Sequence, residues 1–586
     1  MSIRPPLKEL NIKTHNKGFY KGFNRSVTVT SKILVTLVVI WILSDIENSG
    51  AILEAMKNWS FTNLNSYYTY AVAFYVLVCL AVILIPSFGR TKLGSDPNGK
   101  PEFSNFSWFS MIFGAGIGIG VLTYSAAEPL WHLANNPDTI MAKDMIIASL
   151  NSNNIPIPQD ADVFALYQSE VAANAIPALD GIVVPKTEAA LDAAYRYSFF
   201  HWGISAWATY SLVGICLAFF CYARNLPLTM RSALAPLFGR SLEGPLGNII
   251  DISAVIATIF GIAQTIGIGL SSFASGLYSL TGMTWLVTDA ANPEPTVGAL
   301  LMSLLVVMCL SMASALSGVG RGVKWLSNIN MVLSFLLLAF FLIFGASMFA
   351  LEMLGKGILS YVIHLPAMLV TVWDPNTELG VWQTSWSVFY WAWWIAFAPF
   401  VGMFLARISK NRTIREFGLI GIVAPSLTLF IWFSFIGGTG INLEMSGIAN
   451  GQIYNSGLTA QLFDIIGLML SPAMANALSA MVVVLLLTYL VTSADSALLV
   501  INMVNAAGKV QVENGQKHII VWTIALTAVI AALILAGGLD AITSAMMVAA
   551  IPFSFIIILM AISLLKALIL DNRRAKEEIL EINTEQ

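Results

Sequence analysis

Charged residues are scarce in this chain of 586 residues, where Asp, Glu, Lys and Arg together make up only 11%. A soluble domain usually carries about 25%. Hydrophobic residues make up 57% of the chain, and the mean hydropathy is +0.76. The chain also lacks the long charged domain that a soluble enzyme with a membrane anchor would need. These absences exclude a soluble globular protein and indicate a polytopic membrane protein.

Cysteine is nearly absent, and the residues present lie within apolar runs: Cys79, Cys216, Cys221 and Cys309. Their spacing suits neither a disulfide framework nor a metal site, so we interpret them as buried thiols. A cleavable signal peptide is not expected, because about thirty polar residues precede the first apolar run. No nucleic-acid-binding motif is present, and we expect no nucleic-acid partner.

Apolar runs of about twenty residues recur along the whole chain, and each is long enough to cross the hydrocarbon core of a bilayer. We predict an all-α protein with twelve membrane spans, at roughly 30–46, 68–87, 105–131, 195–222, 247–279, 298–314, 325–352, 384–406, 416–437, 472–498, 518–536 and 541–568. A further apolar stretch at 356–370 is too short to cross, and we interpret it as an interfacial helix.

Basic residues mark every second loop. They cluster in the N-terminal tail and after the second, fourth, sixth, eighth, tenth and last spans. The loop from 133 to 190 carries seven acidic residues against Lys143 and Lys186. Because cytoplasmic loops hold the excess of Lys and Arg, we expect both termini to face the cytoplasm and this long loop to lie outside.

One stretch of the third span, FGAGIGIGV at 113–121, has glycine at every second position. Each glycine in a helix interior costs about 1 kcal/mol relative to alanine. Irregular backbone at membrane depth persists only where it faces a cavity or other protein, and carbonyls freed there can ligate a cation. Close helix packing would also explain this spacing of small residues, so both readings stay open.

The eighth span is predicted to be the second interrupted helix, because Pro399 and Gly402 lie in its middle. A pair of interrupted spans at corresponding positions of two halves is typical of a transporter site. Spans three to seven and eight to twelve would form two sets of five, the second inverted relative to the first. We therefore divide the chain into a cytoplasmic tail (1–29), two accessory helices (30–103), a first repeat (104–355), an interfacial helix and linker (356–380), a second repeat (381–568) and a short cytoplasmic tail (569–586).

Aromatic residues form the second conspicuous pattern. Trp202, Trp207 and Tyr210 would lie within about 140° of arc on one face of a helix. The eighth span adds four tryptophans, at 386, 391, 393 and 394. Each alone fits an interfacial belt or ordinary packing. Together they indicate a cage for a quaternary ammonium, which has no N–H to donate and is bound by ring faces.

Few polar groups lie within the spans. We interpret Glu128 as a cap or ion-pair partner near the outer end of its span. Asp495 could be a structural partner, a gate or a proton site, and we favour a structural role. The adjacent hydroxyls of Thr492 and Ser493 could bond back to the preceding carbonyls or ligate a hard cation such as Na⁺.

Several motifs together resemble the betaine/choline/carnitine transporters: GAGIGIGV with AAEPL, FHWGISAWATYSLVG, NLPLTMRSALAPLFG, ATIFGIAQTIGIG, FYWAWWIAFAPFVGMFLARIS with RTIREF, and VTSADS. Their order and loop spacing match from about residue 15 to 570. The resemblance implies twelve spans, with two inverted five-helix repeats after two accessory helices, as in the wider five-plus-five fold. It also implies assembly as a homotrimer in the bacterial cytoplasmic membrane.

The resemblance also implies a binding site. The substrate-binding residues would be Trp202, Trp207, Tyr210, Trp394, Gly116, Ile117, Gly118, Gly120, Thr265 and Phe397. A Na⁺ site would use Gly114, Ile117, Tyr489, Thr492 and Ser493, and a second would use Thr258 with the region of Phe400. Two residues depart from the family pattern: Ile262 replaces a threonine at the second Na⁺ site, and Phe397 replaces a tryptophan. The short C-terminal tail gives no support for osmotic activation.

Gly120 occupies the position where proton-coupled choline carriers of this family tend to have aspartate. A zwitterion brings its own carboxylate, so we expect Na⁺-coupled symport of glycine betaine or dimethylsulfoniopropionate by alternating access. Proton-coupled choline uptake and sodium-independent carnitine-type antiport remain alternatives, as do a channel and a non-transporting osmosensor. An enzyme is not expected, because the chain shows no nucleophile or metal cluster.

Overall fold

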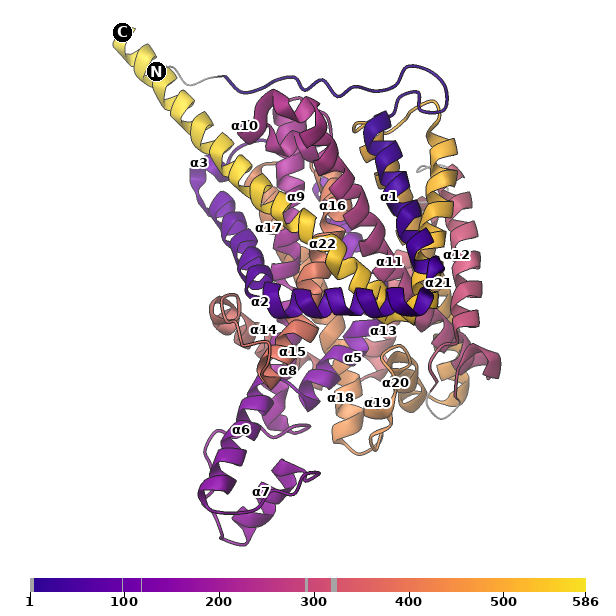
Figure 1. Cartoon of the computed structure of the whole chain (residues 1–586). Helices are drawn as coiled ribbons and strands as arrows, with labels where there is room; N and C mark the ends of the chain where they lie inside the picture. The colour runs from indigo at the N-terminus through magenta and orange to yellow at the C-terminus, as the bar shows by residue number, and fades with distance from the viewer. Residues whose placement is uncertain (1–4, 97, 117, 290–292, 318–323, 586) are drawn as a thin grey trace.

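The computed structural model of the chain describes residues 5–96, 98–116, 118–289, 293–317 and 324–585 (Figure 1). In these ranges the chain is almost wholly helical, and its β structure is limited to isolated bridges. The N-terminal half holds α1 (Arg25–Ser44), α2 (Ile46–Leu84), α3 (Pro86–Gly89), α4 (Asn105–Gly116), α5 (Ile119–Ala134), α6 (Pro137–Ser152), α7 (Val163–Ala172), α8 (Leu191–Trp202), α9 (Ile204–Ala218), α10 (Ala235–Phe238), α11 (Pro245–Thr281) and α12 (Val297–Ser317).

The C-terminal half holds α13 (Lys324–Phe344), α14 (Ser347–Met368), α15 (Glu378–Gln383), α16 (Phe389–Ile408), α17 (Ile414–Trp432), α18 (Gly438–Met445), α19 (Gln452–Asn455), α20 (Gln461–Met469), α21 (Pro472–Asn505) and α22 (Gly515–Glu585). Single π-helical turns join some of them: η2 (Phe219–Ala223), η7 (Thr384–Val388) and η8 (Phe433–Gly437). Short 3₁₀ turns are η1 (Glu188–Ala190), η3 (Met230–Leu234), η4 (Gly239–Glu243) and η5 (Thr284–Leu286).

Among the described residues, eleven helices are long and apolar enough to cross a membrane. The count differs from the predicted twelve for identifiable reasons. The third span is divided between α4 and α5, which are each too short to be counted. The last two spans lie in α22, where the backbone leaves helical geometry at Gly537 and Gly538. The stretch predicted to be too short to cross is longer than expected, because α14 already begins at Ser347, and this helix of 22 residues is one of the eleven.

The third span is interrupted, as the glycine run predicts. α4 ends at Gly116 and α5 begins at Ile119, while Gly118 between them has extended backbone with φ −162° and ψ −169°. Residues 113–121 therefore do not form one continuous helix. Ile117 lies outside the described residues.

The eighth span is not interrupted in its middle, and that prediction is wrong. α16 runs without a break through Pro399 to Ile408. Neighbouring helices compensate for proline within a membrane span, and α16 packs against α9, α11 and α22. A Cβ at Gly402 would lie 2.5 Å from Val213, so this glycine serves close packing on α9.

The second interruption lies instead in the fourth span, between α8 and α9. Gly203 separates the two helices with φ −92° and ψ −133°. A Cβ at Gly203 would lie 2.5 Å from the Phe199 carbonyl oxygen and 2.7 Å from the Phe430 ring, so only glycine fits there. Trp202 consequently belongs to α8 and Trp207 to α9, rather than to one face of a continuous helix.

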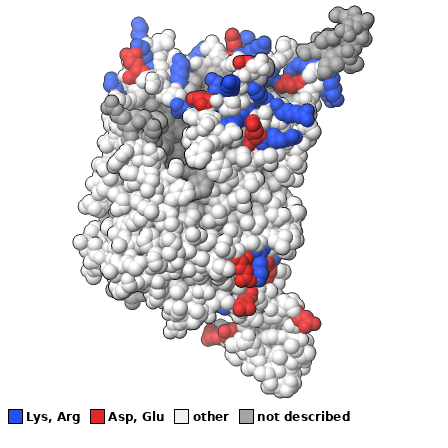
Figure 2. All heavy atoms as spheres, turned by 180° about the vertical axis from the view of Figure 1, so that it is seen from behind, with Lys and Arg blue, Asp and Glu red and all other residues white. Residues whose placement is uncertain are grey.

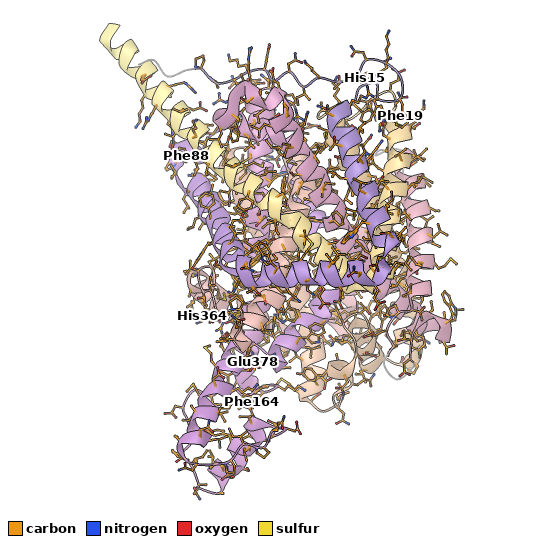
Figure 3. The ribbon with its side chains drawn as sticks, viewed as in Figure 1. His15, Phe19, Phe88, Phe164, His364 and Glu378 are labelled. Atoms are coloured by element: carbon orange, nitrogen blue, oxygen red, sulfur yellow. The ribbon has the colours of Figure 1, made fainter. Side chains whose placement is uncertain are left out.

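Charge is distributed unevenly along the long axis of the molecule. Figure 2 shows Lys and Arg gathered at one end, a broad uncharged zone in the middle and acidic residues on the opposite projection. The termini lie at the basic end, and α6 and α7 form the projection at the other (Figure 1). Figure 3 places Phe164 in this projection and Glu378 close to where it joins the bundle. The uncharged zone matches a bilayer-embedded belt.

Candidate functional site

The predicted aromatic residues come together in the interior of the bundle. Trp202, Trp207, Tyr210 and Trp394 are all buried. The ring centroids of Trp202 and Trp394 lie 5.0 Å apart at 70°, and those of Tyr210 and Trp394 lie 6.0 Å apart at 75°. Trp207 stands edge-on to Tyr210 at 5.4 Å. These edge-to-face contacts connect α8, α9 and α16 and make one aromatic cluster.

Two further rings belong to this aromatic cluster. Trp393 stacks on Trp394 with centroids 4.9 Å apart, and Tyr390 stacks on Trp394 at 5.5 Å. Tyr390 had not been singled out from the sequence, although its spacing of four residues from Trp394 places both on one helix face. The other tryptophans of the eighth span lie at its margin: Trp386 stacks on Tyr390 at 6.4 Å and also contacts Trp131 and His132, and Trp391 contacts Phe200.

The glycine run reaches the aromatic cluster at Gly120. A Cβ at this position would lie 3.0 Å from both the Trp202 and the Trp393 rings. Glycine is therefore needed for close approach of the α5 backbone to the cage. A Cβ at Gly118 would meet nothing within 4 Å. Gly114 and Gly116 lie in the last turn of α4.

Glu128 is the polar centre behind the aromatic cluster. Its Oε2 accepts hydrogen bonds from Trp202 Nε1 at 2.7 Å and from the Tyr390 hydroxyl at 2.5 Å. Its Oε1 lies 2.7 Å from His201 Nδ1 and 3.2 Å from His132 Nε2. The side chain is completely buried within α5. Glu128 is therefore not a helix cap as one of our two readings proposed; it pairs with two imidazoles and two aromatic donors.

His201 extends this network in two directions. Its Nε2 lies 3.0 Å from Ser387 Oγ in η7, and its backbone oxygen accepts from Trp394 Nε1 at 2.9 Å. Since an ionised Glu128 can only accept, His201 Nδ1 is the donor in their contact. Sequence analysis could not find most of this network, because His201, Trp202 and Tyr390 lie 73 to 262 residues from Glu128 and only His132 is near it in sequence.

Glu128, His132 and His201 are also the residues that could hold a metal ion. One ligand atom from each lies within 4.8 Å of the others, and all three side chains are buried. Their contacting atoms are already engaged in the hydrogen bonds just described, and only His132 Nδ1 lacks a partner. The arrangement fits a hydrogen-bonded network around a carboxylate.

Thr265, one of the predicted substrate-binding residues, lies on α11. Its hydroxyl bonds back to the Gly261 carbonyl at 3.4 Å, at the long end of the range. Beside it, Gln264 accepts from Thr543 at 3.0 Å while its buried Nε2 has no hydrogen-bond partner. An uncommitted amide donor in the interior makes Gln264 a further candidate for an anionic group.

Three of the predicted Na⁺ ligands, Tyr489, Thr492 and Ser493, lie on α21, whereas Gly114 lies on α4. The Thr492 hydroxyl bonds back to the Thr488 carbonyl at 3.0 Å and accepts from Asn330 on α13 at 2.9 Å. The Tyr489 hydroxyl lies 2.7 Å from Ser334 Oγ. Ser493 is partly buried. The back-bonding reading therefore holds for Thr492, whose hydroxyl oxygen keeps one lone pair that these two contacts do not use.

Residues of the second predicted Na⁺ site lie where α11 and α16 pack together. The Thr258 hydroxyl bonds back to Ala254 at 2.8 Å. Phe400 lies 5.1 Å from Phe397, whose ring is 6.5 Å from Tyr210. Phe397 therefore continues the aromatic cluster along α16.

Asp495 is buried and accepts a hydrogen bond from Ser314 on α12 at 2.5 Å. Ser496 also contacts its carboxylate, at 3.1 Å. Within the described residues it forms no ion pair with Lys or Arg. This link between α21 and α12 agrees with a structural role.

The fold and this site define a polytopic helical membrane protein with an aromatic cluster against a helix break, which is the architecture of a transporter. The family model described as betaine/carnitine/choline family transporter matches residues 26–152 and 168–573. The chain belongs to this family. It is a multi-pass membrane transporter and not an enzyme.

Individual relatives are similar over most of their length. The glycine betaine transporter OpuD of Bacillus subtilis is 35% identical over 87% of this chain and 88% of its own. A glycine betaine/proline/choline transporter of Vibrio parahaemolyticus is 31% identical over 96% of this chain and 93% of its own. The betaine/ectoine transporter LcoP of Corynebacterium glutamicum is 31% identical over 94% of this chain and 78% of its own.

Proposed function

We propose that this protein imports a zwitterionic methylated onium osmolyte, glycine betaine or dimethylsulfoniopropionate, by Na⁺-coupled symport with alternating access. The observation that carries the proposal is the buried aromatic cluster of Trp202, Tyr210, Tyr390 and Trp394 beside the break between α4 and α5. A methylated cation offers no N–H, and ring faces bind it at up to about 2 kcal/mol each in a dry site.

Sodium coupling is supported by the residues around the helix break. In this proposal Na⁺ binds the carbonyls at the end of α4 together with Tyr489, Thr492 and Ser493 of α21. Oxygen ligands of this kind suit a hard monovalent cation, and irregular backbone frees the carbonyls. The proposal does not include a second Na⁺ at Thr258, because the Ile262 side chain offers no oxygen ligand. The relatives' printed names include betaine, proline, choline and ectoine, so the substrate range is part of the proposal.

The proposal extends to assembly and orientation. We propose a homotrimer in a bacterial cytoplasmic membrane with the basic end of Figure 2 toward the cytoplasm, since Lys and Arg favour that side. Both described ends of the chain would then be cytoplasmic, and the projection of α6 and α7 would lie outside.

Uptake into proteoliposomes tests the function. Radiolabelled glycine betaine and dimethylsulfoniopropionate are supplied with an inward Na⁺ gradient, and in a parallel arm K⁺ replaces Na⁺ on both sides. We expect saturable accumulation that depends on the gradient. Uptake of equal size in K⁺ buffer would favour carnitine-type antiport, and choline uptake driven by a proton gradient would favour the proton-coupled alternative.

A further inference from the structure

A completely buried carboxylate stands behind the aromatic cluster. Glu128 has no exposed surface, and among the described residues its ion-pair contacts are only with His132 and His201. A buried charge is costly unless hydrogen bonds satisfy it. Ionisable groups inside a membrane protein are accordingly rare and tend to serve function. The contacts of Glu128 indicate which function it serves.

The two donors to Glu128 Oε2 are the polar edges of two cluster rings. Trp202 donates its indole N–H and Tyr390 its phenolic O–H to this one oxygen. These bonds fix the rotation of both rings, which stand 67° to each other with centroids 5.5 Å apart. An aromatic N–H or O–H that donates to an anion gains electron density, because bonded groups polarise one another at low dielectric.

The remaining contacts hold the carboxylate in place. His201 binds Glu128 Oε1 and is itself fixed by Ser387. The backbone oxygen of His201 accepts a hydrogen bond from the Trp394 indole N–H. Rings from α8 and α16 are thus oriented through residues 128 and 201, although they belong to separate helices.

We propose that Glu128 is a positioning residue that makes the onium site selective for positive charge. This inference rests on the proposed function. Glu128 orients Trp202 and Tyr390 and makes their faces more negative, so a methylated cation binds better than a neutral group of the same shape. Shape alone would not distinguish a trimethylammonium from a tert-butyl head.

Binding of two isosteres separates this electrostatic role from a merely structural one. Glycine betaine and its carbon analogue 3,3-dimethylbutanoate share shape and carboxylate and differ in the charge of the head. Their Kd values are measured by tryptophan fluorescence with purified full-length protein, for wild type and Glu128→Gln. We expect the preference for betaine over the analogue to fall about tenfold in Glu128→Gln. The matched control is Glu378→Gln, which removes an exposed carboxylate paired with Lys143 and should leave the preference unchanged.

The outcomes are distinct. Equal losses of affinity for both ligands in Glu128→Gln, with the preference unchanged, would overturn the inference and leave the proposed function standing. Absence of betaine binding by the wild type would overturn the proposed function, and the inference with it.

Tyr390→Phe provides a variant that keeps every ring and removes one donor to Glu128. If Glu128→Gln does not fold, this variant carries the test. We expect its betaine preference to fall about threefold, and an unchanged preference would contradict the inference.

Discussion

At the scale of single residues, the aromatic cluster depends on a glycine as well as on its rings. Gly120 brings the α5 backbone against Trp202 and Trp393, and an added methyl group would lie only 3.0 Å from both rings. Overpacking of a well-packed interior costs about 1–3 kcal/mol. The rings next to Gly120 are those that Glu128 orients or that stack on Trp394, so an added methyl group would disturb the cage directly.

Gly120→Ala is therefore expected to weaken betaine binding by about tenfold or more. The alanine Cβ must displace Trp202, Trp393 or both, and 1.4 kcal/mol corresponds to a factor of ten. Titration of intrinsic fluorescence measures the Kd. Gly355→Ala is the control, because this exposed α14 glycine has nothing within 4 Å of an added Cβ. Equal affinities of Gly120→Ala and wild type would show that the glycine serves another purpose.

The sequence predicted some of these residues and missed others for a physical reason. Tryptophans and alternating glycines stand out by type, so Trp202, Trp394 and Gly120 could be proposed without a structure. Glu128 and Tyr390 could not, because the meaning of a polar group depends on partners from distant helices. The carboxylate lies shortly before the acidic loop in sequence, yet apart from His132 its partners come from α8 and α16.

At the scale of helices, the short α4 is fastened to the loop between α16 and α17. Trp108 donates its indole N–H to Ser409 Oγ at 3.0 Å. The Arg412 guanidinium lies 4.3 Å from the Trp108 ring centroid and donates to Asn105 Oδ1 and to the Phe103 backbone oxygen. In addition, α4 packs against α17. Alternating access would then move α4 together with α17.

Arg412→Lys tests this attachment of α4. A lysine cannot form the forked pair of hydrogen bonds, and hydrogen bonds of charged groups contribute about 1.5–3 kcal/mol each. We expect amide hydrogen exchange in residues 103–112 to rise at least tenfold, as measured by mass spectrometry. Arg407→Lys, an exposed change on α16, should leave it unaltered. Protection of α4 equal to wild type would contradict the attachment.

Breaks in helices were predicted only in part. The four glycines within residues 113–121 predicted the break between α4 and α5. Gly203 gave no comparable pattern, since one glycine in an apolar run reads as packing, and the groups that leave no space for a side chain there, the Phe199 carbonyl and the Phe430 ring, are visible only in the fold. Pro399 suggested a break that α16 does not have, because the surrounding helices hold the segment straight. Local propensity is overridden wherever tertiary contacts surround a span.

At the scale of the whole molecule, the projection of α6 and α7 has a small apolar core of its own. Tyr167 packs with Ile146, Leu150 and Ile176 in a cluster separate from that of the bundle. The Tyr167 hydroxyl accepts from Leu179 N at 2.6 Å. Residues 153–167 also fall outside the match to the family. Only this middle part of the projection therefore lies outside the part of the chain that matches the family, whereas α6 lies within it.

Tyr167→Ala should loosen the projection without altering the pocket. Truncating a buried aromatic costs about 3–5 kcal/mol, which a small satellite core cannot absorb. We expect proteolytic cleavage between residues 153 and 187 to accelerate at least tenfold, while the betaine Kd changes less than twofold. Phe106→Ala, an exposed ring on α4, serves as a control for proteolysis of the projection. A parallel loss of betaine affinity would show instead that the projection and the pocket are coupled.

The central claim is that indole and phenol rings of α8, α9 and α16 hold a methylated cation. Equilibrium binding of radiolabelled glycine betaine to purified wild type and Trp394→Leu, in Na⁺ buffer, tests it most directly. We predict saturable binding by the wild type and a loss of at least a hundredfold in affinity in Trp394→Leu, with both proteins equally folded by circular dichroism. Equal affinities in the two proteins would contradict the account.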